Sequence, residues 1–136
     1  MDAATLDRPF GLPADSVEIV LDLPFPVSVN AIWGARNGGG VRRTAHYVRW
    51  LEAADMHVMA TKQYPRRKIQ GPFAIQIALS DDRGGDGDNY IKVCLDWLQS
   101  RDVIPNDKLC RKGAWEWVPP AEAPSGVRIT LRSLHG

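Results

Sequence analysis

The sequence predicts an α/β (α+β) domain with a single mixed β-sheet and helices packed on it. Three segments alternate apolar and polar side chains, as strands with one buried face do: residues 17–23, 73–79 and 127–132. Two segments with helical periodicity lie between these strands, and an extended segment over residues 107–118 precedes the last one. The predicted order of elements is therefore β-α-β-α-β-β.

The first helix is predicted to begin after Thr44 and to end before Pro65, which cannot continue a helix. Its apolar positions recur at spacings of four, three and four residues: Tyr47, Leu51, Ala54 and Val58. The second helix is predicted over about residues 88–100. The glycine-rich residues 37–40 before the first helix predict a flexible loop.

The chain has 136 residues, which is the size of one domain. Residues 1–15 mix proline, glycine and small residues without periodicity, and they predict a loose N-terminal arm. The remainder, residues 16–136, is predicted to form the single domain.

Charge is unevenly distributed although the formal net charge is only +1. Residues 29–80 carry eight Lys or Arg and two acids, whereas residues 81–100 carry five aspartates and two bases. A basic middle of this kind is compatible with a polyanionic partner despite the neutral total.

Several classes of protein are disfavoured by composition. The two cysteines, Cys94 and Cys110, are too few for a disulfide framework and lack the spacing of a zinc site. The longest charge-free stretch near the N-terminus, residues 23–35, is too short and too proline-broken to span a bilayer. No basic stretch leads into an apolar run, as it does in a signal peptide. We expect a cytoplasmic protein with no membrane partner.

The most informative segment is residues 81–92, at the junction between a predicted strand and the second helix, where residues 80–89 form a loop of glycine and aspartate. Asp86 and Asp88 are two residues apart, and in an extended loop their carboxylates lie on the same side. The glycines around them leave room for a ligand or a neighbouring backbone. Crowded carboxylates repel unless a cation lies between them, and Mg²⁺ prefers such oxygen ligands.

Two other interpretations of this loop remain open. Asp86 or Asp88 can act as the N-cap of the helix, where a carboxylate is favoured. A calcium loop that starts at Asp82 fits at Asp86 and Gly87, but Val93 occupies the twelfth position, where the bidentate acid belongs.

The second helix is apolar around most of its circumference. Val93 and Trp97 lie nearly opposite the face formed by Ile91, Leu95 and Leu98. In a domain this small, this pattern predicts a dimer interface along Val93 and Trp97. The polar side of the helix carries Asp88, Lys92, Asp96 and Gln99.

The pattern Asp86-x-Asp88-Asn89-x-x-Lys92-x-x-x-Asp96-x-Leu98, followed by Asp107, resembles the signature of RusA-type Holliday junction resolvases. The proline-rich residues 23–30, which end in Asn30, resemble an upstream segment of the same family. The predicted element order also agrees with a RusA-like fold.

The resemblance implies an endodeoxyribonuclease that depends on Mg²⁺ or Mn²⁺ and acts as a homodimer on four-way DNA junctions. It implies that Asp86, Asp88 and Asp107 hold the metal and that Lys92 is the catalytic lysine. Asn89 and Asp96 would be supporting positions. A second hypothesis, from a different functional class, is a non-catalytic branched-DNA-binding protein of the same fold. A third hypothesis is a calcium-binding module.

The basic middle of the chain predicts the DNA-binding surface. One group flanks the glycine-rich loop and the other follows the first helix: Arg36, Arg42 and Arg43, then Arg66, Arg67 and Lys68. Trp33, Trp115 and Trp117 are assigned to the core or to an interface. One departure from the family pattern is that Gly84 and Gly85 stand where the family tends to be basic.

Overall fold

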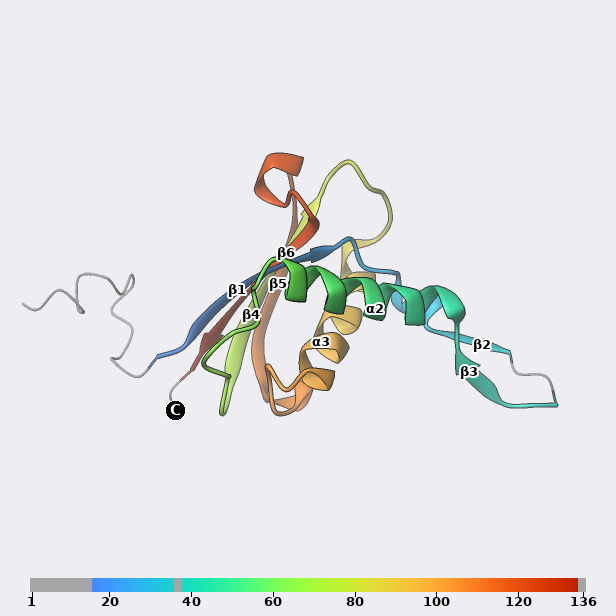
Figure 1. Cartoon of the computed structure of the whole chain (residues 1–136), viewed down its shortest axis with the longest axis horizontal. Coiled ribbons are helices and arrows are strands. Elements are labelled where there is room, and N and C mark those ends of the chain that lie inside the picture. Colours follow the sequence, from blue (N-terminus) through green and yellow to red (C-terminus); the bar gives the residue numbers. More distant parts are fainter. Residues whose placement is uncertain (1–15, 36–37, 135–136) are drawn as a thin grey trace, which may run out of the picture.

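A four-stranded mixed sheet forms the centre of the computed structural model, which describes residues 16–35 and 38–134 (Figure 1). The order of its strands is β1-β6-β4-β5, where β4 pairs antiparallel with β6 and parallel with β5. The strands are β1 (Glu18–Pro24), β4 (Phe73–Ser80), β5 (Cys110–Val118) and β6 (Gly126–Ser133). The predicted α+β class with a mixed sheet is confirmed, while the predicted arm over residues 1–15 lies outside the described residues.

Two helices cover one face of this sheet: α2 (Ala45–Ala60) and α3 (Ile91–Ser100) (Figure 1). Thr44 caps α2, since its hydroxyl accepts a hydrogen bond from the Tyr47 backbone N–H at 3.2 Å. Of the four predicted apolar positions of this helix, Tyr47, Ala54 and Val58 are buried and Leu51 is partly buried, while Trp50 is buried beside it. None of the helices among the described residues has the length and apolarity needed to cross a membrane.

Alternate residues of the strands face the helices and form the core. The buried side chains from the strands are Ile19, Leu21, Leu23, Phe73, Ile75, Ile77, Leu79, Val127, Ile129 and Leu131. The opposite face of the sheet is polar, and cross-strand ion pairs join Asp22 to Arg128 at 2.9 Å and Glu18 to Arg132 at 3.4 Å. The alternation in the sequence therefore identified which sheet face is buried.

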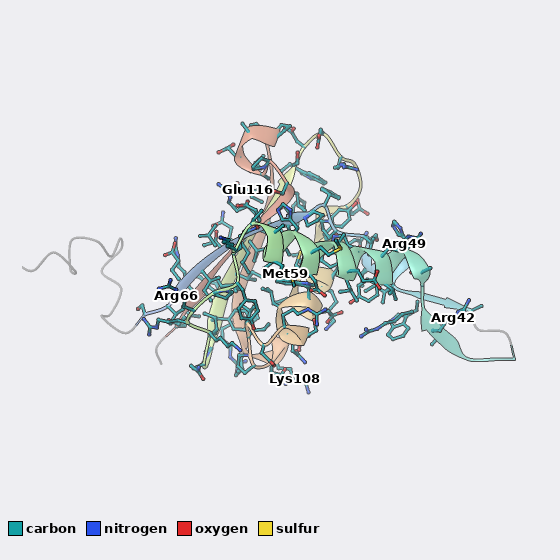
Figure 2. All side chains as sticks on the ribbon, viewed as in Figure 1. Arg42, Arg49, Met59, Arg66, Lys108 and Glu116 are labelled. Atoms are coloured by element: carbon teal, nitrogen blue, oxygen red, sulfur yellow. The ribbon has the colours of Figure 1, made fainter. Side chains whose placement is uncertain are left out.

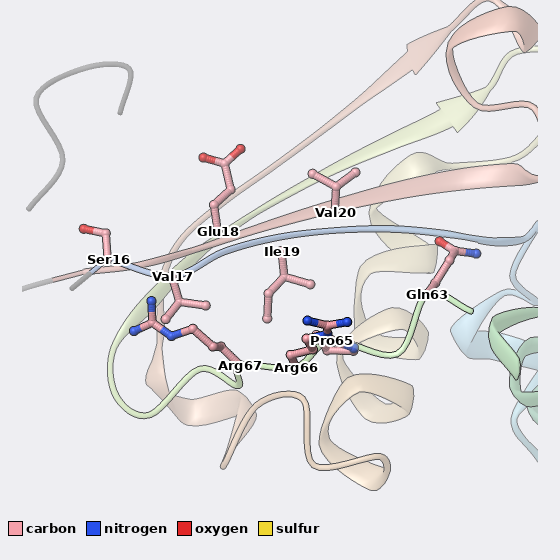
Figure 3. A pocket seen from close by; sticks show the side chains of 9 residues that line it. All are labelled: Ser16, Val17, Glu18, Ile19, Val20, Gln63, Pro65, Arg66 and Arg67. Carbon is pink, nitrogen blue, oxygen red and sulfur yellow. The ribbon is translucent and has the colours of Figure 1, made fainter. Parts of the chain in front are cut away.

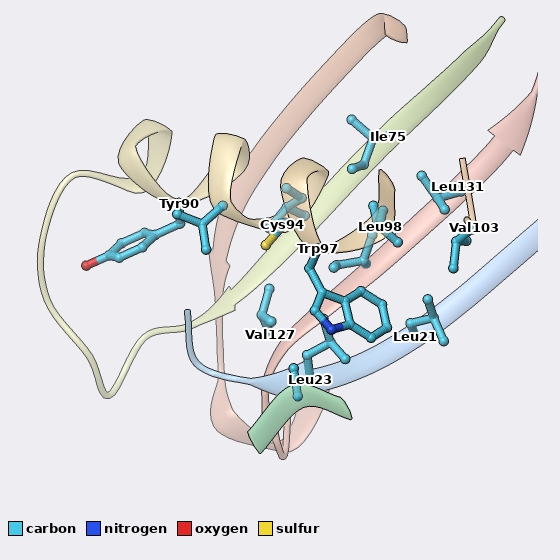
Figure 4. Packing of buried hydrophobic residues seen from close by; sticks show 14 of the residues in the cluster. Leu21, Leu23, Ile75, Tyr90, Cys94, Trp97, Leu98, Val103, Val127 and Leu131 are labelled. Atoms are coloured by element: carbon cyan, nitrogen blue, oxygen red, sulfur yellow. The ribbon is translucent and has the colours of Figure 1, made fainter. Parts of the chain in front are cut away.

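The predicted dimer interface along Val93 and Trp97 is wrong for these residues, because they are 0% and 1% exposed within the single chain. Figure 4 shows the Trp97 indole packed among the strand residues on the helix side of the sheet. Its Nε1 donates a hydrogen bond to Asp55 of α2 at 2.9 Å. The second apolar side of α3 is thus covered by α2 rather than by another subunit.

A second difference from the prediction is a short hairpin around the glycine-rich loop. β2 (Trp33–Ala35) and β3 (Val41–Arg43) pair antiparallel and form a two-stranded sheet of their own. This hairpin extends away from the main sheet, beyond the N-terminal end of α2 (Figure 1).

The parallel pairing of β4 and β5 determines where the acidic loop lies. Parallel neighbours need a crossover connection, and here α3 provides it. The acidic loop leaves the carboxyl end of β4 and continues into the 3₁₀ turn η3 (Gly87–Tyr90), which leads into α3. A second 3₁₀ turn, η4 (Asp107–Leu109), leads from the crossover into β5.

Candidate active site

Aromatic rings hold the acidic loop in place through two of its glycines. Gly85 has φ = +107°, and a Cβ atom there would lie 2.4 Å from the Tyr90 hydroxyl. That hydroxyl donates a hydrogen bond to the Gly84 carbonyl at 2.8 Å. A Cβ atom on Gly87 would lie 2.3 Å from the ring of Trp115 on β5. The space that the glycines leave is therefore filled by protein side chains, which fix the path of the loop.

If the aspartates of η3 have the nuclease role that the sequence predicts, Gly87→Ala should lower DNA cleavage by about a hundredfold, the effect of displacing catalytic groups by roughly 1 Å. The added methyl group cannot coexist with the Trp115 ring, so η3 and its aspartates must move. Single-turnover cleavage of a DNA junction measures the effect. Gly84→Ala is the matched control, because its Cβ would meet nothing within 4 Å. Equal cleavage by the two variants would contradict the importance of this contact.

Asp86 and Asp88 are exposed carboxylates at the start of η3. Asp86 occupies the N-cap position, but its side chain makes no capping hydrogen bond, and α3 also begins without a side-chain cap. Neither aspartate side chain has a hydrogen bond or ion pair within the described part of the chain. The capping interpretation thus does not account for either residue.

Lys92 lies between two carboxylates on the polar side of α3. Its Nζ is 3.0 Å from Asp96 Oδ1, one helical turn away, and it donates a hydrogen bond to Asp107 Oδ2. The hydrogen bond to Asp107 raises the pKa of Lys92, and the neighbouring Asp96 acts in the same direction. In return, Lys92 holds the pKa of Asp107 below its usual range. Lys92 is therefore an ammonium group, with a side chain that remains 51% exposed.

The loop of Asp107 is oriented by the same helix. Gln99 Oε1 accepts a hydrogen bond from the Asp107 backbone N–H at 2.9 Å. Because the Lys92 side chain is half exposed, its ion pair with Asp107 contributes only about 0–1 kcal/mol to the free energy of unfolding. Stability alone is a weak reason to keep a lysine between two aspartates.

The chemistry of these donors fits a hard divalent ion, since all three predicted ligands are carboxylates. The structure does not gather the three carboxylates at one point, and Asp107 Oδ2 accepts a hydrogen bond from Lys92. No three His, Cys, Asp or Glu side chains in residues 16–35 and 38–134 lie together so that they can hold one ion. The structure brings Lys92, Asp96 and Asp107 together and leaves Asp86 and Asp88 on the neighbouring turn.

Tyr47, at the start of α2, connects this site to the hairpin. Burial raises the pKa of Tyr47, and the charge of Asp96 raises it further, whereas Arg43 and Lys92 lower it. The Arg43 guanidinium lies over the Tyr47 ring, 5.5 Å from its centroid. The 3₁₀ turn η2 (Val29–Ala31) packs against η3 and brings Asn30 to this region. Sequence reasoning missed Tyr47 and Tyr90 as neighbours of the site, because both belong to ordinary apolar helix patterns.

The predicted DNA-binding residues do not form one surface. Arg42 and Arg66 lie at opposite ends of the molecule (Figure 2). Arg66 and Arg67 line a hollow of about 380 Å³ beside the edge strand β1, opposite Glu18 (Figure 3). Lys68 lies over the Tyr64 ring at 5.7 Å, and the predicted Arg36 lies outside the described residues.

Fold and site together define an α+β domain in which a strand-to-helix junction presents several carboxylates and one lysine, as expected of a nuclease. The chain belongs to the RusA family: the family model described as Endodeoxyribonuclease RusA matches residues 24–132. Membership implies endodeoxyribonuclease activity on Holliday junction DNA, and the predicted family is confirmed. No curated protein matches the chain in a sequence search.

Proposed function

We propose that this protein resolves four-way DNA junctions by paired hydrolytic nicking that depends on Mg²⁺ or Mn²⁺. One observation carries the proposal. The side chains of Asp86 and Asp88 have no partner within residues 16–35 and 38–134, and the helix that follows them holds a lysine between two further aspartates. Unpaired carboxylates two residues apart repel each other, and a bound cation relieves that repulsion. The matched family segment, residues 24–132, contains all of these residues.

In this proposal, different residues of the chain have different roles in phosphodiester hydrolysis. Asp86, Asp88 and Asp107 would hold the divalent ion, which supplies Lewis acidity and an activated water when bound. Lys92 binds Asp107 through Oδ2, so the lysine and an ion on Oδ1 would share this carboxylate once it is brought to Asp86 and Asp88. Lys92, still oriented by Asp96, then presents its ammonium group to the charge that develops on the scissile phosphate.

A homodimer is part of this proposal, because paired nicks in opposed strands require two active sites related by twofold symmetry. Its interface lies elsewhere than at Val93 and Trp97, which are buried within the single chain. The proposal includes a cytoplasmic, nucleoid-associated location for a protein of bacterial or phage origin. In it, Asn89 supports the site, and the predicted arginines and lysines bind the DNA backbone.

The second candidate function is a non-catalytic branched-DNA-binding protein of the same fold. The arrangement of the carboxylates favours it, because no three of them in residues 16–35 and 38–134 lie together so that they can hold one ion. Such a protein would bind junctions without a metal and would never cut them.

A synthetic four-way junction with each strand labelled in turn separates the two candidates. We expect nicks in opposed strands in Mg²⁺ or Mn²⁺, and binding without cleavage in Ca²⁺ or EDTA. Binding that never leads to a nick with any divalent ion would establish the second candidate. Light scattering of the same samples measures whether the cutting species is a dimer.

A further inference from the structure

The β2–β3 hairpin exposes apolar side chains that no part of the described chain covers. Trp33 is 57% exposed and Val41 is 66% exposed. Trp33 therefore does not belong to the core. Of the two locations predicted from the sequence, core or interface, only an interface remains. A two-stranded hairpin is marginally stable by itself, and apolar side chains that stay exposed on it add little to its stability. An exposed apolar patch of this kind indicates a binding surface.

The register gives the hairpin two different faces. Trp33 is paired with Arg43, and Ala35 is paired with Val41, so these four side chains share one face. Arg42 is paired with Gly34 and lies on the other face. One face of the hairpin thus carries apolar side chains and the guanidinium group of Arg43, and the other face carries Arg42.

The charge of the surrounding segment indicates an anionic partner. No Asp or Glu occurs between Asp22 and Glu52, whereas Arg42, Arg43 and Arg49 all lie in this interval. Figure 2 shows Arg42 and Arg49 at the same end of the molecule. A partner that combines negative charge with flat apolar faces fits this end better than a purely acidic surface does.

The base of the hairpin, where β3 meets Thr44, is held by hydrogen bonds near the candidate active site. The Thr44 hydroxyl donates a hydrogen bond to the Ala31 carbonyl at 2.5 Å, and the Thr44 backbone N–H donates to the Ile32 carbonyl at 2.8 Å. These bonds tie β3 to the turn η2, which packs against η3, the turn that carries Asp88. A ligand on the hairpin therefore extends toward the carboxylates.

We propose that Trp33 stacks on a base exposed at the branch point of the DNA substrate, while Arg42 and Arg43 bind the flanking phosphates. This inference rests on the proposed function. Bases inside a linear duplex are already stacked on both sides, whereas a branch point leaves base faces accessible to an aromatic ring. The hairpin would thereby distinguish branched DNA from linear duplex.

The test compares binding to a four-way junction and to a linear duplex of the same sequence, in EDTA so that no strand is cut. Trp33→Ala should weaken junction binding about 5- to 150-fold, the range for loss of one base–aromatic stack, and leave duplex binding unchanged. Trp33→Phe should retain part of the preference. The wild type, but not Trp33→Ala, should change the fluorescence of 2-aminopurine placed at the branch point.

Two variants serve as controls. Arg42→Ala should weaken binding to both DNAs equally. It should also reduce the slope of the logarithm of the binding constant against the logarithm of the salt concentration by about one, as loss of a phosphate contact does. Met59→Ala, which removes an even more exposed apolar side chain on α2, should change neither affinity.

Three results would overturn the inference. Unchanged junction preference in Trp33→Ala would exclude stacking, and equal weakening on both DNAs would assign Trp33 to a duplex groove. A change of oligomeric state in Trp33→Ala would assign the hairpin to contact with a second copy. Junction cleavage by the wild type in Mg²⁺ is measured separately, so cleavage with unchanged preference refutes only the hairpin inference. Preference without cleavage by any metal refutes only the proposed nuclease activity.

Discussion

Asp86→Asn should abolish junction cleavage in Mg²⁺ while junction binding persists. The amide keeps the size and shape of the carboxylate but removes the charge that would hold a divalent ion. We expect a loss of at least about a hundredfold in the single-turnover rate, the scale of losing one preorganised charge-stabilising group. Because Asp86 makes no hydrogen bond as an N-cap, the substitution should leave the fold intact.

The matched control for this prediction is Asp81→Asn, a change of the same chemistry at an exposed position in the same loop. Both variants lose one negative charge close to the DNA, so any general electrostatic effect on binding is equal in the two. Only Asp86→Asn should lose cleavage, as measured by the release of nicked strands over time. Cleavage by Asp86→Asn at the rate of the control would remove Asp86 from the catalytic set.

β1, α2, β4 and β6 could be predicted from the sequence because each has one buried face. Alternation along residues 73–79 corresponds to β4, whose residues Ile75 and Ile77 are buried while Gln76 is exposed. The hairpin could not be predicted in this way. Its strands have three residues each and no buried face, so neither a period nor a burial pattern marks them.

The residues of the candidate site could be predicted from the sequence, but only some of the contacts between them could. The spacing of Lys92 and Asp96 places them one turn apart on a helix, and the structure has them in contact. The pairing of Lys92 with Asp107 depends on the crossover from α3 to β5, which local spacing does not contain. The role of Gly87 is similar, since its close neighbour Trp115 comes from another strand.

The assignment of Trp97 to a dimer interface failed because helix periodicity shows which faces are apolar but not what covers them. We expect Trp97→Ala to lower the free energy of unfolding by about 3–5 kcal/mol, the cost of truncating a fully buried aromatic side chain. The change also removes the indole donor to Asp55, although Asp55 keeps its ion pair with Arg101. Urea denaturation measures the effect.

Repeating the denaturation at several protein concentrations distinguishes a core position of Trp97 from an interface position. If Trp97 lies in the core of one chain, the loss is the same at low and high concentration, whereas an interface residue would make the difference depend on concentration. Trp97→Phe should lose less, since it keeps most of the buried ring volume. Met59→Ala, at a position that is 77% exposed on α2, should stay within about 0.5 kcal/mol of the wild type. A stable monomeric Trp97→Ala protein formed from a dimeric wild type would restore the interface interpretation, because a cavity in the core destabilises the fold without dividing subunits.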